Sequence, residues 1–413
     1  MKRGLEKALN MKERRVLVKA FARPYQKGSK KEKGEILDGF VEQTGYVRRY
    51  AARLLRNHGR VVRAGPGVLL RGDVECRVKR VRRRTYDEPV LRALKKIWKM
   101  LDYLCGKRLA AALPETIQAL QRHGELPLRG EVRSKLCRIS AATIDRLLAP
   151  EKKRLQLKAR SGTKPGTLLR HQIPVRTFAD WDEDRPGFSE VDLVAHEGGW
   201  ARGDFAQTLD LTDVASGWTE LAAVPNKAQV WVFEALQQLR QQLPFPLLGL
   251  DSDNGSEFIN HHLYAYCLQE GITLTRSRPH RKNDNCFVEQ KNYSVVRHAV
   301  GYARYDRSEQ VQLLNELYGH LRLMVNFFLP SQKLKEKTRQ GSRVSKRYHP
   351  AETPYQRVLV SEHVSEADKK RLRQQYLQLN PAQLDRDIRR LQQKLLMSTV
   401  RTESRGTVKS RTT

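Results

Sequence analysis

Three acidic residues stand where the surrounding sequence predicts strands or a helix. Asp192 interrupts the strand pattern EVDLVA, Asp253 follows the apolar stretch LLGLD, and Glu289 lies in a helical pattern over 283–298. A carboxylate near a buried face is costly unless it is paired or bound to a cation. If the fold brings the three together, their mutual repulsion predicts a metal site. Such hard oxygen ligands favour Mg²⁺ or Mn²⁺ over Zn²⁺.

Asp253 also has a plain structural explanation. Asp253 begins an Asp-Asn-Gly sequence typical of a tight turn, and Ser256 can cap a helix over 257–270. Other acids compete for the metal role and rank lower, because they fit turn or structural positions or the opposite side of a strand: Asp210, Asp213 and Asp251.

The elements that would position the acids follow one another within residues 175–332. Short apolar strands separated by Gly-containing turns predict an antiparallel meander over 188–195, 205–211 and 218–224. Helix and strand patterns then alternate over 227–243, 247–251, 257–270 and 272–275, and a packing helix follows over 308–329. This order predicts an α/β fold with a mixed five-stranded sheet and helices on its faces.

The motifs SEVDLV, SDNGSEF and RKNDNCFVEQKN, with 60 residues between the first two acids and 35 between the last two, resemble the catalytic core of retroviral integrases and bacterial insertion-sequence transposases. The resemblance covers residues 185–330, and YHPAETPYQRVL downstream resembles the transposases as well. It implies an RNase H-like fold whose triad, Asp192, Asp253 and Glu289, binds two divalent ions, normally Mg²⁺ with Mn²⁺ possible. It also implies a DNA transposase that cleaves element ends and transfers the strand into target DNA.

Polar residues near Glu289 suit contacts with DNA. Arg281 and Lys282 lie in a basic loop before the helix, and Asn292 shares the polar face of Glu289. A mobile surface loop and an ordinary surface amide explain these residues equally well.

Charge is unevenly distributed along the 413 residues, whose net charge is +33. Residues 1–174 carry 44 basic and 16 acidic residues, residues 175–330 carry 14 and 21, and residues 331–413 carry 20 and 8. The basic ends predict a polyanionic partner. The acidic middle would repel phosphate unless its carboxylates hold metal ions.

Residues 33–57 predict two helices joined by a turn at Thr44-Gly45. The polar side of the second helix carries basic side chains that suit a DNA major groove: Arg48, Arg49, Arg53 and Arg56. A generic two-helix hairpin would show the same pattern. Further helical patterns within 85–150 favour a second helix-turn-helix.

These patterns predict four segments. They are a helix-turn-helix DNA-binding domain at 1–75, a second helical DNA-binding region with a basic linker at 76–174, an RNase H-like catalytic core at 175–332, and a basic region with a charged helix and a disordered tail at 333–413. Because two element ends must be joined, we expect a homo-oligomer on double-stranded DNA. Without an apolar membrane span, a signal peptide or paired cysteines, we expect a bacterial cytoplasmic protein associated with the nucleoid.

Two rival functions stay open from the sequence. One is a catalytically silent DNA-binding regulator derived from a transposase, against which the intact triad argues. The other is a metal-dependent ribonuclease acting on RNA-DNA hybrids, against which the large basic helical half argues.

Overall fold

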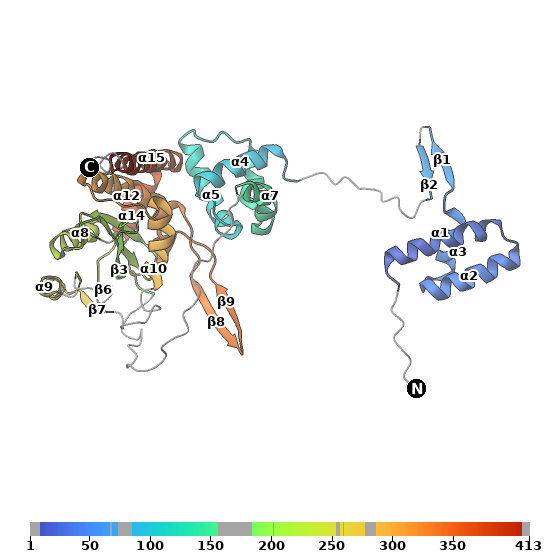
Figure 1. Ribbon diagram of the computed structural model, residues 1–413, viewed down its shortest axis with the longest axis horizontal. Helices are drawn as coiled ribbons and strands as arrows, with labels where there is room; N and C mark the ends of the chain where they lie inside the picture. Colours follow the sequence, from blue (N-terminus) through green and yellow to red (C-terminus); the bar gives the residue numbers. More distant parts are fainter. Residues whose placement is uncertain are drawn as a thin grey trace, which may run out of the picture. The chain divides into compact units, whose positions relative to one another are not determined.

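Figure 1 shows the computed structural model, which describes residues 9–66, 68–72, 85–155, 184–200, 202–252, 257–258, 260–276 and 286–406. The chain divides into two units, Met1–Thr85 and Tyr86–Thr413, each with its own internal contacts. The basic run Arg77–Arg84 lies outside the described residues.

The described part of the first unit contains three helices and a hairpin: α1 (Met11–Lys27), α2 (Lys30–Thr44), α3 (Arg48–Asn57), β1 (Val61–Gly65) and β2 (Val68–Arg71). Phe40, Ala51 and Leu55 are fully buried where the helices meet. Gly45 ends α2 with a φ of 65°, a left-handed conformation that glycine adopts without strain. The two helices therefore lie where the sequence predicts them.

Four helices begin the second unit: α4 (Glu88–Met100), α5 (Gly106–Arg122), α6 (Gly130–Arg138) and α7 (Ala141–Arg154). Ser140 caps α7, because its hydroxyl accepts the Thr143 N–H. The fully buried Trp98 donates its indole N–H to the Leu104 carbonyl. The apolar core of these helices is continuous with the core of the sheet that follows.

The sheet contains β3 (Phe188–Ala195), β4 (Gln207–Asp213), β5 (Thr219–Val224), β6 (Gly249–Ser252) and β7 (Thr273–Arg276). Its order is β5-β4-β3-β6-β7, with β3, β4 and β5 antiparallel and β6 and β7 parallel to β3. A meander followed by two parallel strands on the other side of β3 is the RNase H-like arrangement. The α/β fold class predicted from the sequence is confirmed.

Two helices cover β5. Helix α8 (Gln229–Gln242) packs on β4 and β5, and α12 (Ser308–Phe328) runs along β5. Asn315 bonds both the N–H and the carbonyl of Ala223, and Asn326 does the same with Thr219. The two asparagines therefore satisfy backbone groups at the edge of the sheet.

The C-terminal part differs from the sequence prediction in detail. The basic, turn-rich stretch forms an antiparallel ribbon of β8 (Leu334–Gln340) and β9 (Arg343–Tyr348), and α13 (Pro354–Val360) and α14 (Glu366–Gln378) follow it. Helix α15 (Pro381–Gly406) continues past residue 398, where the sequence predicts a disordered tail. None of the described helices is long and apolar enough to cross a membrane.

Helix α9 (His261–Gln269) also departs from the predicted start at residue 257. Asn260 begins the helix instead, because its side-chain oxygen accepts the Leu263 N–H at 2.9 Å. Ser256, the predicted cap, lies outside the described residues.

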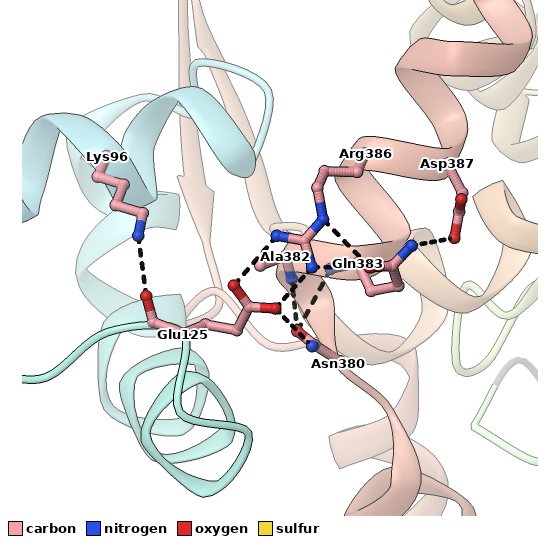
Figure 2. Close-up of polar contacts among 7 residues, drawn as sticks. All are labelled: Lys96, Glu125, Asn380, Ala382, Gln383, Arg386 and Asp387. Carbon is pink, nitrogen blue, oxygen red and sulfur yellow. Dashed lines mark hydrogen bonds and ion pairs between the residues drawn. The ribbon is translucent and has the colours of Figure 1, made fainter.

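A polar clasp joins the α5–α6 connection to α15 (Figure 2). The Glu125 carboxylate accepts two hydrogen bonds from Arg386, at 2.6 and 3.0 Å, and one from Asn380 at 2.8 Å. Lys96 of α4 donates to the Glu125 backbone carbonyl. The bonds from Arg386 and Asn380 lower the pKa of Glu125 to about 2.

We predict that Glu125→Gln lowers the free energy of unfolding by about 1 kcal/mol at neutral pH, as for partly exposed ion-pair networks. The folded-state pKa lies below the ordinary value of 4.5, so the ionised clasp stabilises the fold above pH 4.5. That contribution is lost as the pH falls through about 2. Urea unfolding of both chains across this range measures the effect, and a difference that grows toward low pH would contradict it. Glu131→Gln, which removes an exposed acid paired with Lys135 within α6, is the control.

Candidate active site

Strand β3 places two acids on one face of the sheet, since Glu190 and Asp192 are two residues apart. Asp210 of β4 is the partner of Asp192 across the antiparallel pair, and Asp251 of β6 is the partner of Glu190 across the parallel pair. Side chains of directly paired residues lie on the same face. Four acids are therefore gathered on one side of three adjacent strands, which we call the acidic face: Glu190, Asp192, Asp210 and Asp251.

The helix that carries Glu289 is held against the acidic face by two contacts. Glu190 Oε2 accepts the Phe287 and Val288 backbone N–H groups, both at 2.8 Å, in the first turn of α10 (Cys286–Lys291). Asn292 donates its side-chain N–H to Asp192 Oδ2 at 2.7 Å. Glu289, which is exposed, lies between these two contacts along the helix. Glu289 and Asp192 thus come to the same side of the sheet.

A change of helix type begins at Asn292. The α-helical turns of α10 give way to a π-helical segment, Asn292–Arg297, before α11 (His298–Val300). The sequence predicts one regular helix over these residues. Single π-helical turns inside α-helices are frequent at functional sites. Here the segment starts with the residue whose amide bonds Asp192.

Burial dominates the electrostatics of the acidic face. Burial, opposed by the two N–H bonds from α10 and aided by the neighbouring Asp251 and Glu289, raises the pKa of Glu190 to about 8. The neutral form of Glu190 is therefore favoured in the ion-free protein. Burial also raises the pKa of the fully buried Asp210, and nearby Asp192 adds to the shift. Acids of this face therefore raise one another's pKa in the ion-free protein.

The half-buried Lys291 also belongs to this region. Burial lowers the pKa of the Lys291 ammonium, while attraction to Asp210 opposes that shift. Lys291 donates to the Gly217 carbonyl at 3.1 Å in the turn between β4 and β5. Within the described part of the chain, Asp210 Oδ2 and Asn292 Oδ1 are buried and have no hydrogen-bond partner. These oxygens leave acceptor capacity beside Asp192 of the kind that a hard cation uses.

Asp213 stabilises the β4–β5 turn. Its carboxylate accepts the Gly187 N–H at 2.8 Å and the Ser216 N–H at 2.7 Å. Asp251 accepts the hydroxyl of Thr275 on β7. Both acids thus have partners within the protein.

Two of the three predicted ligands lie in described elements, Asp192 on β3 and Glu289 on α10, and the Glu190 and Asn292 bonds join these elements. Asp253, Arg281 and Lys282 lie outside the described residues. The described ranges contain no group of three His, Cys, Asp or Glu residues arranged to hold a metal ion. Sequence reasoning missed Glu190 and Lys291. The available signal was the spacing of two between Glu190 and Asp192 in an otherwise apolar strand.

The four arginines predicted to contact DNA are exposed on α3 in the first unit. Arg48 forms an ion pair with Asp38 of α2. Arg49, Arg53 and Arg56 extend from the side of α3 opposite the buried Ala51 and Leu55. The helix therefore has one apolar and one basic side, as its sequence predicts.

Comparison with known proteins gives a full-length relative. The chain is 42% identical over 357 residues to the uncharacterized protein y4rM of Sinorhizobium fredii (strain NBRC 101917 / NGR234), which covers 86% of this chain and 97% of that protein. The chain belongs to the y4rM family. No family model matches it.

Among solved structures, the y4rM-like chain resembles retroviral integrase catalytic cores. The core domain of BIV integrase is 21% identical, covers 43% of this chain and 96% of its own, and has a TM-score of 0.30. The HTLV-2 integrase core in complex with magnesium, in a dimeric form, is 14% identical, covers 36% and 91%, and has a TM-score of 0.28. Because these scores are low, the RNase H-like assignment rests on the strand order.

We predict that Glu190→Ala lowers the free energy of unfolding by about 3 kcal/mol, because two buried N–H groups of α10 lose their acceptor. Glu190→Gln, whose amide oxygen accepts in the same place as the protonated acid, should stay within about 1 kcal/mol of the wild type. Urea unfolding at pH 7 measures both. Equal losses for the two variants would show that the helix does not depend on this acceptor.

Proposed function

We propose that this y4rM-family chain is a DNA transposase that binds the ends of an insertion element and catalyses metal-dependent strand cleavage and strand transfer. The observation that supports the proposal is that α10, which carries Glu289, is bonded to strand β3, which carries Asp192, through the Glu190 and Asn292 contacts. An acidic residue that served only solubility would not need to lie beside the acidic face of the sheet.

Asp253 completes the proposed triad. The described part of β6 ends at Ser252, whose partner on the parallel strand β3 is Val191. The next residues along the chain are Asp253 after Ser252 and Asp192 after Val191. On this basis we assign Asp192, Asp253 and Glu289 as ligands of two Mg²⁺ ions, with Mn²⁺ as the substitute.

The residues of the candidate active site fit two divalent metal ions. Their donors are carboxylate oxygens, and the neighbouring acids repel one another in the ion-free protein. When bound, two such ions activate the attacking oxygen and stabilise the leaving oxygen of an in-line displacement at phosphorus.

The protein's own residues orient this site. Asn292 bonds one oxygen of Asp192, and Glu190 holds the start of α10 by accepting two of its backbone N–H groups. Lys291 ties the end of α10 to the β4–β5 turn. We also assign Arg281 and Lys282 to the phosphates next to the scissile bond. Water attacks first, and the freed 3′-hydroxyl then attacks target DNA, so no covalent bond to the enzyme forms.

In this proposal, the first unit recognises the DNA. The exposed arginines of α3 would read an element end in the major groove. Because strand transfer needs two ends at once, the active form would be a homo-oligomer assembled on DNA.

We predict that Asp192→Asn, Asp253→Asn and Glu289→Gln each reduce Mg²⁺-dependent cleavage and joining of an element-end duplex by about 10²–10³-fold or more, because each removes charge stabilisation at the reacting phosphate. Binding to the same duplex should persist. The measurement is a gel assay of nicked and joined products beside a binding titration.

Glu366→Gln, an exposed acid on α14, is the matched control and should cleave like the wild type. Specific binding by the wild-type chain without any cleavage in Mg²⁺ or Mn²⁺ would instead identify the silent regulator. Hydrolysis confined to RNA-DNA hybrids would identify the ribonuclease.

We predict that replacing Arg49, Arg53 and Arg56 together with Ala weakens binding to the element end and lowers the salt slope of binding by about 2 to 3, since each phosphate contact contributes about 0.9. Replacing Lys27, Lys30 and Lys31 with Ala removes the same charge elsewhere in this unit and is the control. Equal losses for the two triple variants would argue against recognition by α3.

A further inference from the structure

The ribbon β8–β9 carries a dense positive charge. Between residues 334 and 348 there is a single acid, Glu336, which faces Arg347 at 3.6 Å. The basic residues of this stretch are Lys335, Lys337, Arg339, Arg343, Lys346 and Arg347. A polar loop needs far less charge than this to stay soluble, so the excess calls for an anionic partner.

The ribbon is exposed along its length. Every side chain from 334 to 348 that the structure describes is exposed, including the apolar Leu334, Val344 and Tyr348, each more than 40% accessible. Figure 1 shows the two strands projecting from the helices and sheet of their unit. Isolated two-stranded ribbons gain little stability from their own contacts. An extended ribbon that buries so little is therefore suited to contacting another molecule.

The root of the ribbon is fixed beside the acidic face. Lys333, just before β8, donates to the Ala215 carbonyl at 2.7 Å, and Arg357 of α13 donates to the Ser216 carbonyl at 3.0 Å. The next carbonyl in the same turn, that of Gly217, accepts from Lys291. Three successive carbonyls of the β4–β5 turn thus link the ribbon root to the helix that carries Glu289.

A backbone pairing closes the root from the other side. Ser331 and Glu352 form an antiparallel bridge, and Arg357 also bonds the hydroxyl and the carbonyl of Ser331. The His349 N–H donates to the Lys333 carbonyl. The ribbon therefore starts from a base that hydrogen bonds fix at both of its strands.

We infer that β8–β9 is an arm that binds duplex DNA through its phosphates, next to the segment held in the candidate active site. A two-stranded antiparallel ribbon has the width of the DNA major groove, and lysine and arginine are the usual partners of the flanking phosphates. The inference rests on the proposed function in one respect, which is that the bound polymer is DNA. It adds a second DNA contact, in the same unit as the acidic face and separate from α3.

The test uses the full chain with Lys335, Arg339, Lys346 and Arg347 all replaced by Ala. The control replaces two lysines and two arginines on the exposed sides of α14 and α15: Lys370, Arg371, Arg390 and Lys394. Affinity for a duplex of random sequence is measured by fluorescence anisotropy over a salt series. Thermal unfolding checks that both variants keep the fold.

The arm variant should bind at least about tenfold more weakly than the control, with a salt slope lower by about 2 to 4. An affinity and slope equal to those of the control would overturn the inference, and so would a loss seen only with single-stranded RNA as ligand. If the wild-type chain cleaves DNA while the arm variant binds like the control, the inference alone fails. If the arm effect is present but no chain cleaves DNA, the proposed function fails and the arm stands.

Discussion

The structure depends on one electrostatic constraint, which is that several carboxyl groups share a largely buried face of one sheet. Strand pairing alone places Glu190, Asp192, Asp210 and Asp251 there. Such a face is stable only if protonation, hydrogen bonds or cations compensate it. The protein's own atoms supply part of this compensation: backbone N–H groups of α10 on Glu190, a threonine hydroxyl on Asp251 and the half-buried Lys291 near Asp210.

The contacts that compensate the buried acids also position the helix that carries Glu289. The N–H groups that Glu190 accepts belong to the helix that carries Glu289, and the amide that bonds Asp192 begins the π-helical segment of that helix. A helix this short has little stability of its own, so its place depends on these bonds. The remainder of the unit holds the sheet: the asparagines of α12 close its edge, and the Glu125 clasp joins α15 to the helices before it.

Acidic and basic side chains are concentrated on different elements of the structure. Acidic groups are concentrated on the sheet, while basic side chains are exposed on α3 in one unit and on the β8–β9 ribbon in the other. A polyanion attracted by the basic parts would still be repelled by the acidic face in the absence of cations. Under the proposed function, divalent ions remove this repulsion where the phosphate must come close, which couples substrate binding to metal binding.

The sequence by itself determined where these strands and helices lie along the chain. Alternation and turn signals located the strands of the meander to within two residues, and the apolar spacing located α8 and α12, because local periodicity reports which face of an element is buried. It also singled out Asp192 and Glu289 as acids in unusual places. Only the tertiary structure decided that Glu190 caps α10, that Lys291 lies near Asp210 and that residues 334–348 form a ribbon rooted beside them. These contacts join residues about 75 to 120 positions apart, and a local pattern holds no information about partners so distant in the chain.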